Sequence, residues 1–217
     1  MIVEICKQGT PEWLRARCAA ITASRVSDAI AVMQRNSGHR KVGDPTEASD
    51  KYAIEIAIER ISGEPYGEPV KAWTLNRGHE MEGFARLGYE ARTMNLASES
   101  GVILTDDRKF GYSSDGLVGD DGLIEIKCPV DTVKIMAMLT THDVSEYTHQ
   151  IQTGLWITGR KWLDFIQYVP ALEPVGKDLF YKRIYRDEAF IDEMVEKLIA
   201  FEKRVTEYET ALRQHAA

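Results

Sequence analysis

The stretch Ser113–Pro129, SSDGLVGDDGLIEIKCP, joins an acidic turn to a short apolar strand that carries two charges. Asp115 lies in the SDG turn, and Glu125 and Lys127 follow within the strand. Because side chains alternate between the two faces of a strand, Glu125 and Lys127 point to one face and the apolar residues around them point to the other. A carboxylate and an ammonium group therefore share one surface.

The chemistry of this surface suits a hard divalent cation. A short hairpin would return the Asp115 carboxylate to the side of Glu125, and the backbone carbonyl of Ile126 could supply a further oxygen. Magnesium is the natural candidate for such a site. One or two such ions orient a water molecule in phosphodiester hydrolysis, help to deprotonate it and stabilise the leaving oxygen. Lys127 would position or activate that water.

A plainer interpretation is that Glu125 and Lys127 form the solvated face of an edge strand, because surface charge pairs are common. Taken alone, the pair favours this interpretation. The surroundings change the balance, since both residues lie in an otherwise apolar strand between the SDG turn and Cys128-Pro129. Matching motifs elsewhere in the chain favour the catalytic interpretation further.

Helical and strand patterns alternate around this stretch. Short β-favouring runs separated by turn signals between Gly101 and Cys128 predict a small antiparallel meander. The predicted helices span 46–61, 76–94, 130–139, 145–156 and a last segment capped near Asp187, and later strands span 162–169 and 179–185. This order predicts one mixed α/β domain over residues 1–217.

Composition sets limits on the class of protein. The chain has 217 residues, of which 44% are hydrophobic, enough to bury one full core. Lys and Arg number 27 against 34 Asp and Glu, a net charge of -7, so any contact with DNA must be local. Cys6, Cys18 and Cys128 show no CxxC spacing and predict neither a disulfide framework nor a zinc or iron–sulfur cluster. Without a leader or an apolar run of membrane-spanning length, the protein is expected to be soluble and cytoplasmic.

Several blocks of sequence, taken in order, resemble the phage lambda exonuclease family, which includes the YqaJ-type viral recombinases. They are GTPEWLRAR with ITAS, RGHEMEGFA, SSDG, IEIKCP and YTHQIQTGLWITG. Each block alone is weak, but together they are highly specific and extend over nearly the whole chain. The resemblance implies a restriction-endonuclease-like core, in which a central mixed β-sheet is flanked by helices.

The resemblance also implies a catalytic centre. Its six side chains are Lys127, Glu125, Asp115, Gln150, Glu82 and Tyr147. Metal binding falls to the two carboxylates Asp115 and Glu125 and to the Ile126 carbonyl, with Lys127 as the catalytic lysine. Two magnesium ions are expected, with manganese as a substitute. Gln150 matches the glutamine beside the attacking water.

Arg17, Ser24 and Ser113 match the residues that hold a terminal 5′ phosphate in this family. Their chemistry is suitable, because a guanidinium grips phosphate as a fork and a hydroxyl donates a single hydrogen bond. Without the resemblance, Arg17 would be taken as a surface residue and Ser24 as a helix cap. Trp13 either lines the same entrance or packs against the N-terminal helix.

The function implied by this family is magnesium-dependent 5′-to-3′ exonuclease activity. Such an enzyme processively degrades one strand of linear double-stranded DNA and exposes a 3′ single strand for phage recombination. The expected assembly is a homotrimer around double-stranded DNA, the expected partner is a phage single-strand annealing protein, and the expected location is the bacterial host cytoplasm. Two alternatives stay open: a structure-specific or Cas4-like endonuclease, and a noncatalytic DNA-end-binding scaffold.

The polar loop Gln34–Pro45 departs from the lambda-type pattern, so the resemblance assigns no strand-separating arginine there. Its basic residues suit either phosphate contacts or an ordinary solvated charge run. His79 and His149 lie beside matched residues, but hard-cation sites favour oxygen ligands, and neither histidine is placed in the metal site.

Overall fold

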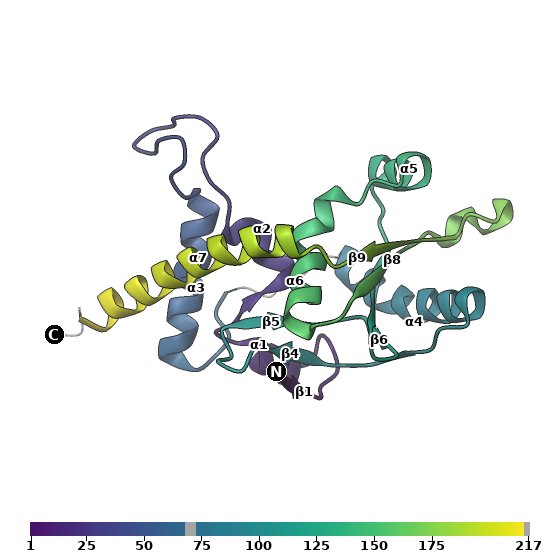
Figure 1. The fold of residues 1–217 in the computed structure, drawn as a ribbon, viewed down its shortest axis with the longest axis horizontal. Coiled ribbons are helices and arrows are strands. Elements are labelled where there is room, and N and C mark those ends of the chain that lie inside the picture. The colour runs from purple at the N-terminus through teal and green to yellow at the C-terminus, as the bar shows by residue number, and fades with distance from the viewer. Residues whose placement is uncertain (68–72, 215–217) are drawn as a thin grey trace.

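The computed structural model describes the backbone of residues 1–67 and 73–214, and the side chains of these residues except 73–79 (Figure 1). The elements in chain order are β1 Ile2–Glu4, α1 Pro11–Arg17, β2 Ile21–Thr22, η1 Ala23–Arg25, α2 Val26–Ala29, α3 Glu47–Ser62, α4 Trp73–Thr93, β3 Ala97–Ser98, β4 Val102–Leu104, β5 Phe110–Tyr112, β6 Gly116–Val118, β7 Gly122–Lys127, α5 Thr132–Thr141, η2 Ser145–Tyr147, α6 Thr148–Thr158, β8 Trp162–Tyr168, η3 Pro170–Val175, β9 Leu179–Tyr185 and α7 Glu188–Gln214. In the described part of the chain, no helix has the length and apolar character needed to cross a bilayer.

The strands form two mixed sheets. The larger has the order β3-β6-β7-β8-β9, with β7 and β8 parallel, and the smaller has the order β1-β4-β5-β2, with β2 and β5 parallel. Helices flank both sheets, which confirms the predicted fold class of a mixed sheet between helices. The prediction of a single antiparallel meander is wrong, because β4 and β5 pair in one sheet while β6 and β7 pair in the other.

The polar sequence SSD explains why the meander divides. The Ser114 hydroxyl donates to the carbonyl oxygen of Gly116 at 2.7 Å and accepts from the Gly116 N–H at 3.1 Å, which closes a tight local turn. Asp115 then accepts the N–H of Ile126 at 2.6 Å, a bond that replaces strand pairing at this point. The chain therefore leaves the smaller sheet after Tyr112 and joins the larger one at Gly116.

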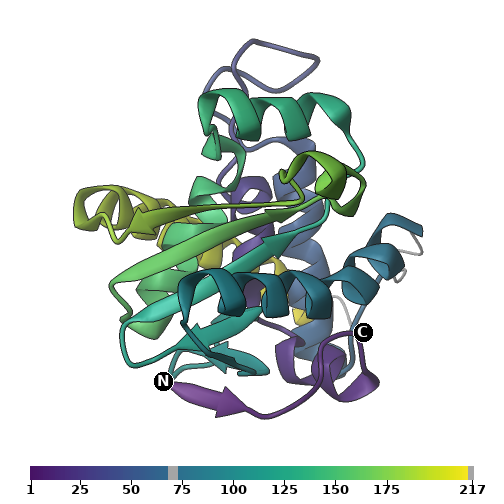
Figure 2. The same cartoon turned by 90° about the vertical axis from the view of Figure 1, so that its right-hand side faces the viewer.

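Strand β7 lies between two cores. Leu123 belongs to the larger core with residues of α3, α6 and α7, while Ile124 and Ile126 pack with α4 on the opposite face. Figure 2 shows α4 running across one face of the sheet. Glu125 shares the face of Leu123, is only 3% exposed and lies on an inner strand, so the solvated edge-strand interpretation is wrong.

The predicted helices and later strands are present, with ends shifted by a few residues. Thr46 caps α3 by accepting the N–H of Ser49, and Asp187 caps α7 by accepting the N–H of Phe190. The apolar stripe of α7 is buried as its spacing predicts. In the loop Gln34–Pro45, Arg40 is held by Asp50 at 2.7 Å and by a backbone carbonyl, so this arginine is engaged within the protein.

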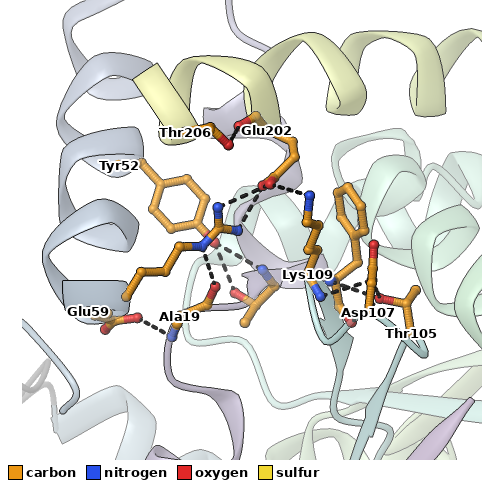
Figure 3. A network of polar contacts seen from close by, with 11 residues as sticks. Ala19, Tyr52, Glu59, Thr105, Asp107, Lys109, Glu202 and Thr206 are labelled. Carbon is orange, nitrogen blue, oxygen red and sulfur yellow. Dashed lines mark hydrogen bonds and ion pairs between the residues drawn. The ribbon is translucent and has the colours of Figure 1, made fainter. Parts of the chain in front are cut away.

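A buried ion-pair network ties α7 to the segment between α1 and β2 (Figure 3). Glu202 of α7 accepts two hydrogen bonds from Arg60 of α3, at 3.0 and 2.8 Å, and pairs with Lys109 at 2.9 Å. Glu59, the neighbour of Arg60, accepts the N–H of Ala19 at 2.7 Å. Ala19 is a non-glycine residue with φ of 65°, a strained conformation that needs such support.

Replacing Glu202 with alanine tests this network. Glu202→Ala leaves the partly buried Arg60 guanidinium without its carboxylate, and we expect a loss of about 2 kcal/mol in the free energy of unfolding. Glu209→Ala is the matched control, because Glu209 lies on the same helix and pairs with the exposed Arg213. Its loss should stay below about 0.5 kcal/mol. Urea denaturation measures both, and equal losses would contradict the structural role of the network.

Candidate active site

A cavity of about 150 Å³ lies where β7, β5, η1, α1, α4 and α6 meet. Nine of the residues that line it are ones that the sequence singled out: Arg17, Ser24, Glu82, Ser113, Asp115, Glu125, Ile126, Lys127 and Gln150. Residues separated by more than a hundred positions in the chain thus share one hollow. Tyr147 is the exception, because it does not line this cavity.

The Glu125 carboxylate accepts hydrogen bonds from three described side chains. One oxygen accepts from Lys127 Nζ at 2.7 Å and from Gln150 Nε2 at 2.5 Å. The other accepts from the Tyr112 hydroxyl at 3.1 Å. Burial and the neighbouring carboxylates raise the pKa of Tyr112 well above its ordinary value, so its phenol remains a hydrogen-bond donor. One charged donor and two neutral donors thus compensate for burying the Glu125 carboxylate.

Asp115 lies beside Glu125 and is held from three directions. One oxygen accepts the Ile126 N–H at 2.6 Å, the other accepts from Gln8 Nε2 at 3.5 Å, and the backbone carbonyl accepts from Arg86 at 2.8 Å. Burial and the nearby Glu125 carboxylate raise the pKa of Asp115 well above its usual range, against the opposing effect of Lys127. Two carboxylates in one cavity repel each other, and a cation would relieve that repulsion.

Lys127 is positioned by its pairing with Glu125 and by an aromatic ring. Its ammonium lies 5.6 Å from the centroid of the Tyr147 ring, which in turn packs on Phe165. Burial lowers the pKa of Lys127, but the Glu125 and Asp115 carboxylates outweigh burial and hold its pKa above the ordinary value. Tyr147 therefore lies behind the lysine, and the lysine carries a positive charge at neutral pH.

The other end of the cavity is cationic and rich in hydroxyl groups. Parallel pairing of β2 with β5, with Thr22 opposite Gly111, sets Ser24 and Ser113 at neighbouring strand ends. Trp13 Nε1 donates to the Ser113 hydroxyl at 2.9 Å, and the Arg17 guanidinium stacks 4.2 Å from the centroid of the Trp13 ring. Burial lowers the pKa of Arg17, although arginine stays charged at neutral pH.

Sequence reasoning missed two contributors to this cavity. Tyr112 directly precedes the SSD turn, and its burial follows from the strand pattern, but nothing local indicates that its hydroxyl reaches Glu125. Gln8 lies in an irregular segment after β1 and reaches Asp115 across the fold. Trp13, for which two interpretations were open, lines the cavity and orients a serine.

Neither histidine is part of the described site. His149 stacks on Phe190, with Nδ1 3.5 Å from the Ser27 hydroxyl, and burial lowers its pKa. The side chain of His79 lies outside the described residues.

Side chains supply only part of the oxygen ligands that a hard cation would need in this cavity. Among the described residues, no three His, Cys, Asp or Glu side chains are grouped as a ready metal site. Asp115 and Glu125 offer two carboxylates, and the carbonyl of Ile126, the residue after Glu125, offers a third oxygen. Magnesium suits such a sparse set, because it is usually held by one or two carboxylates and keeps several waters or substrate oxygens.

A model of the YqaJ-like viral recombinase domain matches residues 12–161, most of the chain. The chain belongs to the YqaJ-like viral recombinase family. The match includes the cationic end of the cavity at Arg17 and both carboxylates, and among the residues that line the cavity only Gln8 lies outside it.

Solved structures agree with the assignment. An alkaline exonuclease from Laribacter hongkongensis is 35% identical to this YqaJ-like domain, with a TM-score of 0.80 over 95% of this chain and 98% of the other. The same exonuclease in complex with dAMP matches with a TM-score of 0.79. A phage-related exonuclease from Haemophilus somnus, 15% identical over 91% and 96% of the two chains, shares the fold with a TM-score of 0.67. No curated protein sequence matches the chain.

Asp115→Asn tests the electrostatic crowding in the cavity. Since folding raises the pKa of Asp115, the folded state holds the carboxyl proton of Asp115 more tightly than the unfolded state does. The contribution of Asp115 to the free energy of unfolding therefore falls as pH rises through the folded pKa. In chelator at pH 8, we therefore expect Asp115→Asn to melt a few degrees above the wild type, with a smaller difference at pH 5. Adding magnesium should raise the melting temperature of the wild type and leave that of the variant unchanged. A less stable variant in chelator would contradict the crowding.

Proposed function

We propose that this protein is a magnesium-dependent exonuclease that degrades one strand of linear double-stranded DNA from its 5′ end. Its family and its 35% identity to an alkaline exonuclease support DNA exonuclease activity. The observation that carries the finer proposal is that one cavity joins a carboxylate–lysine cluster to an arginine and two serines. Cleavage chemistry and recognition of a terminal phosphate are then coupled within one site.

The cationic end of the cavity favours degradation from the 5′ end. A 5′-terminal phosphate carries more negative charge than an internal phosphodiester and offers three terminal oxygens. Arg17 supplies a guanidinium fork, and Ser24 and Ser113 supply single hydroxyls, which together match this group. Binding the terminal phosphate there would set the next phosphodiester beside Asp115 and Glu125, so that one mononucleotide is released at a time.

The chain's own residues have distinct tasks in hydrolysis. Asp115, Glu125 and the Ile126 carbonyl would hold magnesium, which when bound supplies a polarised water and neutralises charge on the phosphate. The Lys127 ammonium donates hydrogen bonds to the water or to a phosphate oxygen. Gln150 and Tyr112 hold the Glu125 carboxylate in place. Glu82 adds negative charge at the rim of the cavity and favours cation binding there.

The wider assignment includes processive action by a homotrimer that surrounds double-stranded DNA. Such a ring would reconcile a net charge of -7 with DNA binding, because the basic residues need only face the channel. The expected partner is a phage single-strand annealing protein that receives the exposed 3′ strand. Manganese is expected to substitute for magnesium.

Linear duplexes with one defined end test activity, metal and direction together. We expect the wild type with magnesium to release mononucleotides from a 5′-phosphorylated end, more slowly from a 5′-hydroxyl end, and not at all in chelator. Equal loss of label from 3′ ends would contradict the direction. Cleavage of closed circular DNA would favour an endonuclease, and absence of any metal-dependent turnover would favour a noncatalytic scaffold.

Arg17→Gln provides the matched variant for the same assay. It should lose most of the preference for the phosphorylated end, about 10- to 100-fold, because a charged hydrogen-bond donor is removed. Arg15→Gln is the control, since Arg15 lies on the same helix but pairs with the exposed Glu12. An unchanged preference in Arg17→Gln would remove Arg17 from the phosphate site.

Lys127→Ala tests the chemical step. We expect kcat to fall by about 10²- to 10⁴-fold while DNA binding persists, because the ammonium acts mainly in the transition state. Lys161→Ala serves as the control, because Lys161 is exposed and pairs only weakly with Asp121. Rapid-quench release of the first mononucleotide measures the chemical step. A rate equal to the wild type would exclude Lys127 from the mechanism.

A further inference from the structure

We propose that a second, larger cavity beside the catalytic one is a subsite for the nucleoside on the 3′ side of the scissile phosphate. This cavity measures about 570 Å³ and lies between α4, the connection from β3 to β4, and the segment that follows β1. Gln8, Glu82 and Asp115 line both cavities, so the two hollows meet at the catalytic carboxylate. The inference rests on the proposed direction of degradation.

Two polar atoms of this second cavity have no partner among the described residues. Ser100 lines the cavity and is 5% exposed, yet its hydroxyl makes no hydrogen bond. Arg86 also lines it, and its Nε–H is unpartnered, although another guanidinium nitrogen donates to the Asp115 carbonyl at 2.8 Å. Buried polar groups are rarely left unsatisfied, and both of these atoms are shielded from solvent, so a polar occupant would bond them after a small rotation of either side chain.

Part of the wall of the cavity is apolar and exposed. Phe84 and Leu87 of α4 line it and are 59% and 65% exposed. Nucleobases stack on aromatic rings regardless of sequence, because every base has a π-face. An aromatic ring, an aliphatic side chain and two hydrogen-bond donors therefore match a base and its sugar better than they match a phosphate group.

The chemistry of the donors also fits an enzyme that must accept any sequence. An arginine Nε–H only donates, and a serine hydroxyl rotates to donate or accept. All four bases carry at least one acceptor, so neither group selects one base. Gly101, with φ of 68°, packs against the backbone of Glu4 and Cys6 and leaves no room for a Cβ, which fixes the floor beside Ser100.

The order of sites along the strand follows from these positions. With the terminal phosphate at Arg17 and the scissile phosphate at Asp115, the first nucleoside occupies the smaller cavity. The strand beyond the cleaved bond must continue past Asp115, and the second cavity begins there. Phe84 is thus a positioning residue for the second nucleotide, which retains the new 5′ phosphate.

The test uses 5′-labelled duplexes with an abasic sugar at the first, second or third nucleotide of the degraded strand. Release of the first labelled mononucleotide is measured under single turnover with magnesium. For the wild type, we expect an abasic second position to lower kcat/KM by about tenfold, the effect of losing one stacked base. Phe84→Ala should lower kcat/KM on the unmodified duplex by a similar factor. An abasic second position should then lower the kcat/KM of this variant no further. Ser100→Ala should show the same pattern with a smaller loss.

Met94→Ala is the matched control, because Met94 is exposed just beyond the end of α4 and does not line the cavity. It should behave as the wild type does on every duplex. If Phe84→Ala and the abasic second position lowered kcat/KM independently, so that their factors multiplied, the subsite would be overturned. A change of oligomeric state in Phe84→Ala would overturn it too. Normal release with no response to the second position would overturn the subsite alone. No release from the unmodified duplex would overturn the proposed function as well.

Discussion

The hydrogen bond from the Ile126 N–H to the Asp115 carboxylate, 2.6 Å long, connects the parts of this site. It ties the acidic turn that leaves the smaller sheet to the C-terminal end of β7 in the larger one. On one side of this bond lie Ser113 and the cationic end of the cavity, and on the other lie Glu125 and Lys127. If Asp115 moved away, the Arg17 end of the cavity and the carboxylate cluster would no longer share one hollow.

This arrangement has an electrostatic cost. Two carboxylates share one cavity, and the raised pKa of Asp115 reflects its burial and that crowding. The lysine, the glutamine and the tyrosine that contact Glu125 offset part of it. The remainder favours a cation, so the same imbalance that weakens the unliganded fold would strengthen ligand binding.

Much of this site could be predicted from the sequence because its central features are local. Alternation along β7 correctly set Glu125 and Lys127 on one face, and helix caps at Thr46 and Asp187 follow from short-range rules. The division of the predicted meander between two sheets could not be predicted. Its strands share one β-favouring pattern, and β4 and β5 differ from β6 and β7 in the strands with which they pair far along the chain. The Tyr112 and Gln8 contacts also depend on tertiary packing, and Tyr147 lies behind Lys127 for the same reason.

The network around Glu202 has a consequence for how mutations in this protein would be interpreted. The strained turn at Ala19 follows Arg17, and it is held in place by α3, which is itself clamped by the middle of α7. A genetic screen for altered choice of DNA ends would therefore recover substitutions in two helices that line no part of the cavity. Distance from the proposed cleavage centre is a poor guide to functional tolerance here, because the scaffold that supports the proposed phosphate site is assembled from opposite ends of the chain.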